Sequence, residues 1–378
     1  MSFIMNIRSV AKYESKILVR SWFFRIFTLL AVVFLGFFNF AMMLMEDNFG
    51  LWFAKSVSSN IPYLNLLLLN TGQAVVAVFL SSEFLKRDKK LDTSEVFYVR
   101  PLSNAEYVVG KIWGNLRVFL FLNLLVLAIV LAFNFMASGV TVDLPAYLVY
   151  FFLISIPTLI FIIGLSIFLM LLLKNQALTF ILLLGYIGLT LFYIQDKFYY
   201  LFDYMVYNLP LFKSTIVGFS NLELILNHRA IYFFAGLGFI FFTIFLFKRL
   251  PNARRSHYPW LFLSFCMFLL MVTAGFRHVR SILWEGEMRA LYTSINNKYV
   301  YETKMAIDYS DISVEQKSET IRSVVGMEGT ALAASEVFIF CLNPGLRVEE
   351  VKDGEKSLNF KREEQILAVD FGRKIEKG

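Results

Sequence analysis

Residues 151–173 read FFLISIPTLIFIIGLSIFLMLLL, an apolar run without one charged side chain. A helix of about 20 such residues is long enough to cross the hydrocarbon core of a bilayer. Together with residues 147–150 the run predicts a membrane-spanning helix, and Pro157 inside it predicts a kink. Seven stretches of this kind predict seven spans, at 26–45, 61–82, 118–137, 147–173, 177–194, 230–247 and 259–276.

The composition of the whole chain agrees with this interpretation. Of its 378 residues 58% are hydrophobic, 42 are Phe, and only 17% are charged. A soluble protein of this length has too small an interior for so much apolar surface. We therefore expect an all-α polytopic membrane protein. The net charge of +7 is attributed to basic loops rather than to nucleic-acid binding, and two cysteines 75 residues apart do not predict a disulfide framework.

The distribution of Lys and Arg predicts the orientation. One set of flanks, 1–25, 83–117, 174–176 and 248–258, carries 17 basic residues, and the opposite set carries 4. Because basic loops stay in the cytoplasm, the N-terminus should be cytoplasmic in the cell inner (plasma) membrane. An odd number of spans then places residues 277–378 on the extracytoplasmic side. The predicted spans contain no acidic residue, which disfavours a proton-coupled carrier.

Three segments outside the spans have distinct characters. Residues 1–25 contain Arg8, Lys12, Lys16 and Arg20 at helical spacing, which predicts a basic amphipathic helix on an anionic inner leaflet, and membrane lipid as a partner. The Tyr-rich stretch 195–229 predicts a helical hairpin that dips into the outer leaflet against protein or a water cavity. Residues 277–378 predict a small, incomplete β-rich domain, an antiparallel meander from Val337 onward.

The loop 83–117 mixes charge with exposed apolar side chains and predicts a helical elbow for docking a partner. Pro101 should break it between two short helices, and Ser103 is a suitable helix cap. A merely solvated connector is the alternative. The expected coupling residues are Glu83, Phe84, Arg87, Thr93, Glu95, Val96, Phe97 and Pro101.

Polar residues inside the second span form one helical face. Asn70, Gln73, Ala77 and Ser81 lie at i, i+3, i+7 and i+11. Such a face either packs against another helix or lines a path, and packing is the commoner case. No phosphate-binding loop, nucleophile elbow or zinc-protease helix motif occurs, and the three histidines match no metal motif. We therefore expect no catalytic residue, no metal and no cofactor in this chain.

The elbow resembles that of the permease subunit of ABC type-2 exporters. The resemblance rests on Ser82-Glu83-Phe84, Arg87, Thr93-x-Glu95, Arg100-Pro101-Leu102-Ser103 and Tyr107-x-x-Gly110-Lys111, and it covers about residues 6–250. It implies a six-span permease domain at 26–250, an elbow that docks on a separate ABC ATPase subunit, and a homodimer or a heterodimer with a second permease. The resemblance further implies ATP-driven alternating access that exports a substrate.

Two features depart from that family: the seventh span at 251–276 and the β-rich domain. The second is similar to the first β-domain of aminopeptidase-N-like metallopeptidases over roughly residues 298–375, but it has no catalytic zinc motif. Two rival interpretations therefore stay open. One is the membrane-anchored part of a metallopeptidase fusion whose catalytic domain is absent, and the other is a non-transporting membrane scaffold. We interpret the chain itself as a transporter subunit and not an enzyme.

Overall fold

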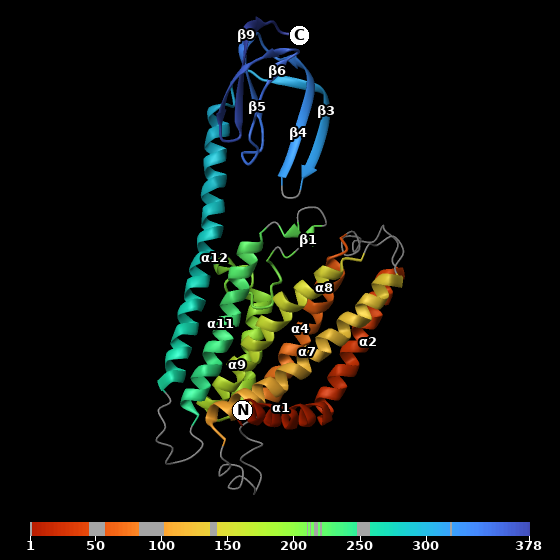
Figure 1. Ribbon diagram of the computed structural model, residues 1–378, viewed down its shortest axis with the longest axis vertical. Coiled ribbons are helices and arrows are strands. Elements are labelled where there is room, and N and C mark those ends of the chain that lie inside the picture. Colours follow the sequence, from red (N-terminus) through yellow and green to blue (C-terminus); the bar gives the residue numbers. More distant parts are fainter. Residues whose placement is uncertain are drawn as a thin grey trace. The chain divides into compact units, whose positions relative to one another are not determined.

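The computed structural model describes residues 2–44, 57–82, 102–136, 142–209, 211, 213–214, 218–219, 221–247, 258–317 and 320–378. The described chain divides into two compact units, Met1–Ser281 and Ile282–Gly378. The first is a helix bundle and the second is rich in β-strands (Figure 1). Each unit is described by itself.

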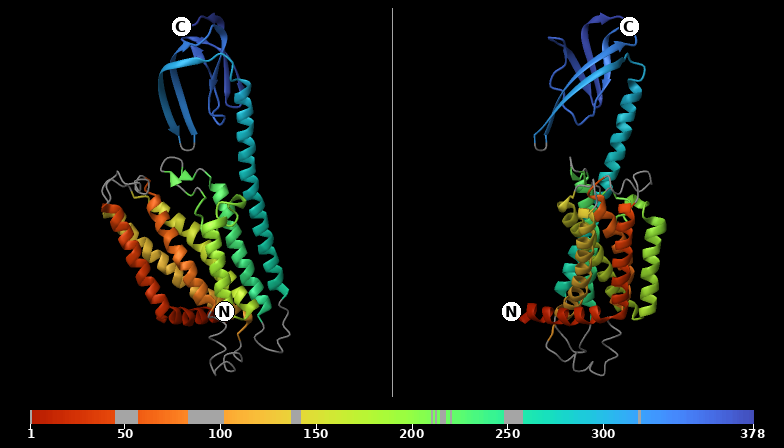
Figure 2. Two further views of the ribbon diagram at one scale, coloured as in Figure 1. Left: turned by 180° about the vertical axis from the view of Figure 1, so that it is seen from behind. Right: turned by 90° about the vertical axis from the view of Figure 1, so that its right-hand side faces the viewer.

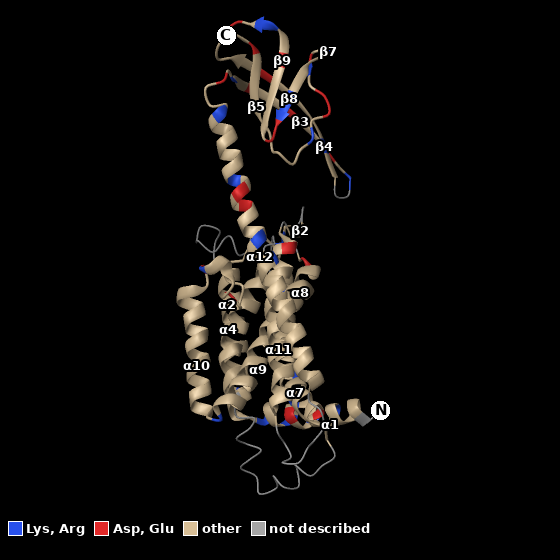
Figure 3. Ribbon diagram, turned by 90° about the vertical axis from the view of Figure 1, so that its left-hand side faces the viewer, with Lys and Arg blue, Asp and Glu red and all other residues tan. Residues whose placement is uncertain are grey.

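Seven helices among the described residues are long and apolar enough to cross a membrane, which confirms the predicted number. Their bounds are α2 (Trp22–Leu44), α4 (Asn60–Ser82), α7 (Asn104–Met136), α8 (Leu144–Tyr150) continued by η1 (Phe151–Ser155) and α9 (Ile156–Leu173), α10 (Gln176–Leu189) continued by η2 (Thr190–Ile194), α11 (Leu222–Leu246) and α12 (Tyr258–Lys298). Charged residues gather at the two ends of the bundle and are sparse along its middle (Figure 3).

Two of these helices run well beyond the apolar stretches that predict them. The third helix begins at Asn104, so the expected second helix of the elbow and the third span are one continuous helix. The seventh continues to Lys298, past the expected end of the span at residue 276. Hydropathy misses these extensions because they carry charged residues, which a helix tolerates where water or partner groups are at hand.

Helix α1 (Ser2–Arg20) confirms the expected N-terminal helix and ends one residue before α2. It lies across one end of the bundle in both views of Figure 2. Arg8, Lys12, Lys16 and Arg20 are all exposed, as the basic face predicts. The opposite face is buried on α7, where a Cβ on Gly110 or Gly114 would come within 2.7 Å of α1 side-chain atoms. The Gly-x-x-x-Gly spacing therefore permits this close helix–helix contact.

The fourth span departs from α-helical geometry where a kink is predicted. Residues Phe151–Ser155 form a π-helical turn, and α9 begins at Ile156 with Pro157 in its first turn. Proline has no N–H to donate to the carbonyl four residues earlier, which here belongs to Leu153. The proline thus accounts for the local change of helix type.

The helical hairpin expected at 195–229 is wrong. After η3 (Phe198–Tyr200) residues 201–209 and 211 are irregular, and a two-residue ladder joins β1 (Lys213–Ser214) to β2 (Gly218–Phe219) before α11 begins. We call residues 195–221 the α10–α11 loop. Its middle part is nevertheless buried in protein, because Tyr204, Met205, Val206, Leu209 and Leu211 are each at most 2% exposed, whereas Phe198, Tyr199 and Phe202 before it are exposed.

The described part of the second unit contains the end of α12 and seven strands. They are β3 (Met305–Lys317), β4 (Thr320–Ala331), β5 (Ser335–Cys341), β6 (Lys352–Asp353), β7 (Lys356–Ser357), β8 (Asn359–Glu363) and β9 (Ile366–Ile375). Ile295 of α12 packs with Ile339 and Ile366 in a small core. The strands after Val337 are present as predicted, but their order, β5–β9–β8, is not that of a meander. The β3–β4 hairpin was not predicted.

Candidate functional site

The coupling residues expected in the elbow, Glu83, Phe84, Arg87, Thr93, Glu95, Val96, Phe97 and Pro101, lie outside the described residues. The described chain resumes just after them with a capped helix start. The Ser103 hydroxyl accepts a hydrogen bond from the Glu106 N–H (3.1 Å), and a Glu106 carboxylate oxygen accepts one from the Ser103 N–H (2.6 Å). This reciprocal pair is a capping box, and it fixes where α7 begins.

The first turns of α7 hold α1 by buried polar contacts. The Lys111 ammonium lies 2.9 Å from the Glu14 carboxylate, and both side chains are at most 4% exposed. Asn6 donates to the other oxygen of Glu106 at 2.9 Å, and Ser15 donates to the Gly114 carbonyl at 2.7 Å. Because the same Glu106 also caps α7, a displacement of the α7 start would be transmitted directly to α1.

The start of α7 also contacts the end of α11. Asn104 donates to the Phe247 carbonyl, and the Tyr107 ring stacks on the Phe247 ring with centroids 5.5 Å apart. Three helices that are distant in sequence therefore meet directly after the expected coupling segment. We call this meeting point the α1–α7 junction; it comprises Asn6, Glu14, Ser103, Asn104, Glu106, Lys111 and Phe247.

The polar face of α4 is fully buried. Asn70 donates to the Asn123 side chain of α7 at 3.1 Å and to the Ser155 hydroxyl of η1 at 3.2 Å. Gln73 accepts from Asn123 at 2.9 Å. Ala77 and Ser81 continue this face and are buried too. In this structure the face thus makes helix–helix contacts, with amide groups that satisfy one another away from water.

A second amide pair joins the first two spans. Asn39 of α2 donates to Asn65 of α4 at 2.7 Å, and Asn65 donates back at 3.1 Å. Since both are buried, each amide satisfies the other where water cannot. The pair fixes the register of these two helices.

Arg229 is a buried cation that the sequence reasoning missed. It belongs to α11 and is 2% exposed. Its Nε donates to the Leu153 carbonyl at 2.6 Å, one Nη to the Tyr204 carbonyl at 2.9 Å, and the other Nη to the Thr158 hydroxyl at 2.9 Å. The carbonyl of Leu153 is the one that Pro157 leaves without its helical donor. Arg229 therefore supplies the hydrogen bond that the proline removes, and it ties the α10–α11 loop to the fourth span.

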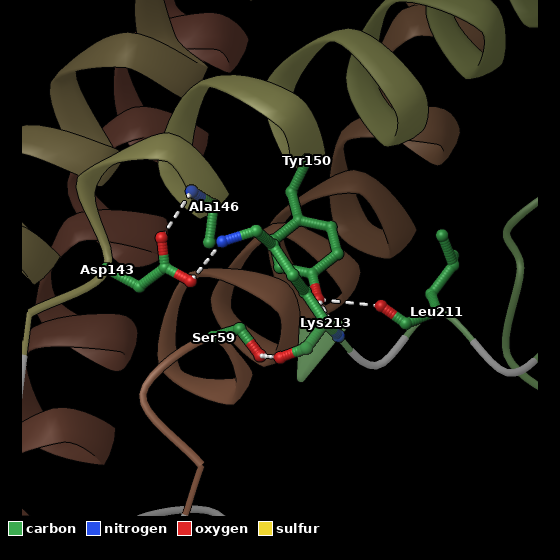
Figure 4. A network of polar contacts seen from close by, with 6 residues as sticks. All are labelled: Ser59, Asp143, Ala146, Tyr150, Leu211 and Lys213. Atoms are coloured by element: carbon green, nitrogen blue, oxygen red, sulfur yellow. Dashed lines mark hydrogen bonds and ion pairs between the residues drawn. The ribbon is translucent and has the colours of Figure 1, made fainter. Parts of the chain in front are cut away.

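The same loop is fastened to the helix ends around it (Figure 4). Lys213 forms an ion pair with Asp143, which also caps α8 by accepting from the Ala146 N–H. Ser59 donates to the Lys213 carbonyl at 2.8 Å, and Tyr150 donates to the Leu211 carbonyl at 2.6 Å. Deeper in the bundle, Tyr63 of α4 donates to the Val206 carbonyl at 3.1 Å. The loop thus closes this end of the bundle by contacts to α4, α8 and α11.

Asp203 is the acidic group of this loop and is 1% exposed. Its two carboxylate oxygens accept from the N–H groups of Tyr207 (2.9 Å) and Asn208 (2.8 Å). Burial raises the pKa of the Asp203 carboxyl, and these hydrogen bonds and the nearby Arg229 partly oppose the rise. The loop therefore contains a buried carboxyl whose charge state depends on its packing.

Several of these residues leave a signal in the sequence. Arg229 lies one residue before the predicted span 230–247. The helix itself begins at Leu222, so a span predicted with that start would have contained Arg229. Gly110 and Gly114 carry the small-residue spacing of a packed helix pair. Lys111 and Glu14 carry no such signal, since their pairing depends on how α1 crosses α7.

Among the described residues no group of three or more His, Cys, Asp or Glu side chains could hold a metal ion. Two histidines do lie together: the rings of His228 and His278 have centroids 5.0 Å apart. Each Nε2 faces a loop carbonyl, that of Tyr200 at 3.0 Å and that of Tyr199 at 2.8 Å. These contacts add to the fastening of the α10–α11 loop.

Comparison with known proteins gives no assignment of its own: no protein-family model and no curated protein matches the chain. The functional conclusion accordingly depends on the contacts described above. These contacts lie at the two ends of the helix bundle, the α1–α7 junction at one end and the fastened α10–α11 loop at the other.

Proposed function

We propose that the chain is the permease subunit of an ABC type-2 exporter that works with a separate ABC ATPase subunit and a second permease copy or partner. The α1–α7 junction is the observation that supports this most. A transporter driven from outside the membrane needs a rigid path from the docking surface to the spans. The junction offers such a path, because α7 begins inside the elbow, directly after the expected coupling residues, and is bound to both α1 and α11.

The opposite end supports the same mechanism. The α10–α11 loop covers the ends of α4, α8 and α11 through single hydrogen bonds and one partly exposed ion pair. These outer contacts can open and re-form at modest free-energy differences, whereas the buried contacts of Arg229 hold the deeper part of the loop. In the proposed cycle ATP-driven movement of the elbow displaces α7 and α1, and the loop opens to release the substrate.

The basic asymmetry of the flanks gives the proposed orientation. It places the α1–α7 junction in the cytoplasm, where an ATPase has access to nucleotide, and the α10–α11 loop and the second unit on the extracytoplasmic side. The exposed Arg8, Lys12, Lys16 and Arg20 of α1 would then face the anionic inner leaflet of the inner membrane.

The elbow supplies the test. Phe84→Ala should lower the affinity of the chain for the ABC ATPase by roughly thirtyfold, since aromatic interface residues contribute about 2 kcal/mol or more. Less ABC ATPase should therefore copurify with the chain from its native membrane. Phe121→Ala is the matched control, because Phe121 is exposed on the apolar part of α7 and should leave ATPase binding unchanged. Recovery of intact protein without any ABC ATPase would favour the scaffold interpretation instead.

A further inference from the structure

The β3–β4 hairpin is a two-stranded ribbon with one apolar face. Residues that pair across it share a face, and the pairs Ile312↔Val325, Val314↔Ser323 and Gln316↔Ile321 define one of them. Ile312, Val314, Ile321, Val325 and Met327 on this face are all more than 40% exposed. Asp311, Glu315, Lys317, Arg322 and Glu328 lie on the other. A two-stranded ribbon is marginally stable alone, and further strands would stabilise it.

Strand β4 has an open edge. Among the described residues it pairs with β3 and with no other strand, and Thr320 through Thr330 are all exposed. An unpaired edge of this length presents a row of N–H and C=O groups to another strand. The free edge of β3 is a poorer self-partner, because Asp308, Asp311 and Glu315 outnumber its one cation, Lys317, and like charges would oppose each other.

The charges of β4 are arranged so that the strand complements itself. Suppose that two copies of β4 pair antiparallel about a two-fold axis through Val325. A residue that lies n positions before Val325 in one copy then faces the residue n positions after Val325 in the other, so the two residue numbers sum to 650. Arg322 of each copy then faces Glu328 of the other, and Val325 faces Val325. Facing residues share a face of the sheet, as an antiparallel pair requires. A two-fold contact repeats each interaction twice, so two opposite-charge pairs form.

The present partners of these charges do not prevent the pairing. Arg322 lies 3.0 Å from Glu349, but both side chains are about 70% exposed, with values of 74% and 68%. An exposed ion pair of this kind contributes little free energy. Arg322 can therefore exchange Glu349 for Glu328 of a neighbouring copy.

We infer that the second unit is a homodimerisation surface: the β4 edges of two copies of this chain pair antiparallel about Val325 and form a four-stranded sheet, β3–β4–β4–β3. The occupant is a second copy because the strand carries one cation and one anion placed symmetrically about its centre. The proposed function already allows a second permease copy; this inference adds the surface and register through which two copies pair, and it does not depend on transport or on an ATPase.

Disulfide cross-linking of the full chain in its membrane tests the register. Cys266 and Cys341 are first replaced by Ser, and Val325→Cys is introduced. Facing Cβ atoms in an antiparallel pair are about 4.5–5.5 Å apart, close to the range that a disulfide spans. Mild oxidation should give a homodimer band, identified by mixing two copies of different tag size. Val314→Cys is the matched control: it lies on the same face, on β3, about three strand spacings of 4.8 Å from its copy, and should cross-link at least tenfold less.

Charge exchange provides the second arm. In the Val325→Cys background, Arg322→Glu or Glu328→Arg alone should slow cross-linking about tenfold, because two opposite-charge pairs become like-charge pairs. The two together should restore the rate. Equal cross-linking at Val325→Cys and Val314→Cys, a disulfide to a different protein, or failure of the double exchange to restore the rate would each overturn the inference. None of these results bears on ATPase binding, which is measured separately.

Discussion

The Lys111 ammonium and the Glu14 carboxylate lie 2.9 Å apart at the crossing of α7 and α1, and neither reaches water to any extent. The two charges are tolerated there only together, since either charge alone would be buried without solvent or a counter-charge. Gly110 and Gly114 let the two helices approach closely enough to exclude water from it. The position of α1 on the bundle therefore depends on both halves of this pair.

The first prediction concerns loss of one half. Lys111→Ala or Glu14→Ala should destabilise the protein by about 3–5 kcal/mol, whereas the double variant Glu14→Leu/Lys111→Met should be near neutral because no unpaired charge remains. Thermal unfolding in detergent measures this. Lys12→Ala, on the exposed face of α1, is the control and should change stability by less than about 0.5 kcal/mol. Equal effects of Lys12→Ala and Lys111→Ala would contradict the prediction.

The second prediction concerns Arg229 and Pro157. Arg229→Met should be strongly destabilising, by about 1–3 kcal/mol for each buried carbonyl left without a donor. Adding Pro157→Ala should recover part of the loss, because alanine returns the N–H that the Leu153 carbonyl accepts in a regular helix. The same thermal assay compares the single and double variants. If Pro157→Ala lowers stability equally with and without Arg229, the two residues do not share that carbonyl.

Apolar runs predicted the spans because a bilayer demands an apolar stretch of fixed length, and that demand is visible residue by residue. Pro157 likewise predicted a departure from α-helix through its own covalent structure. Glu106, Lys111 and Arg117 lower the hydropathy of residues 104–117, so the sequence predicts a short helix of the elbow there and not a part of the third span. Those charges are accommodated by Asn6, Glu14 and Ser15 of α1, a relationship that no local pattern contains.

The β-strands show the same division. Strand β5 was predicted because Phe338 and Ile339 are buried, and a buried strand needs a continuous apolar run. Strands β3 and β4 were missed because neither face is covered, so polar and apolar residues alternate without a run that stands out. The place of β9 between β5 and β8 depends on pairing between distant residues, such as Phe340 with Leu367. Of the candidate site, the helix cap at Ser103 was predicted from sequence, whereas the α1–α7 ion pair was not.

The third prediction concerns the ion pair that fastens the α10–α11 loop. Asp143→Asn removes the charge that faces Lys213 but keeps an oxygen that can accept from the Ala146 N–H, so α8 stays capped. The loop should then exchange backbone hydrogens faster around Leu211 and Lys213, while α9 is unaffected. Hydrogen exchange followed by mass spectrometry measures this. Equal protection of the loop in both proteins would show that Tyr150 and Ser59 hold it without the ion pair.

The fourth prediction is a pH dependence from Asp203. Burial raises its pKa, so the folded protein holds this proton to a higher pH than the unfolded chain does. The corresponding stabilisation is complete below the unfolded pKa and is lost as pH rises through the raised folded value. The melting temperature of the wild type, relative to that of Asp203→Asn, should therefore rise on acidification from pH 7. Asp196→Asn, at an exposed position in the same loop, is the matched control and should change stability by less than about 0.5 kcal/mol. A relative melting temperature that falls on acidification would contradict the sign.

The fifth prediction tests the orientation with one cysteine at each end of the chain. In a protein with Cys266 and Cys341 replaced by Ser, Ser313→Cys on exposed β3 should react with an impermeant thiol reagent in intact right-side-out vesicles. Ser9→Cys on exposed α1 should react only after the vesicles are opened. The reason is the excess of Lys and Arg in the flanks on the side of α1, 17 against 4, which we expect to hold that side in the cytoplasm. If all seven candidate helices of the described chain cross the membrane, the two positions lie on opposite sides. Labelling of both in intact vesicles would mean an even number of spans, and the reverse pattern would mean that the basic flanks face outward.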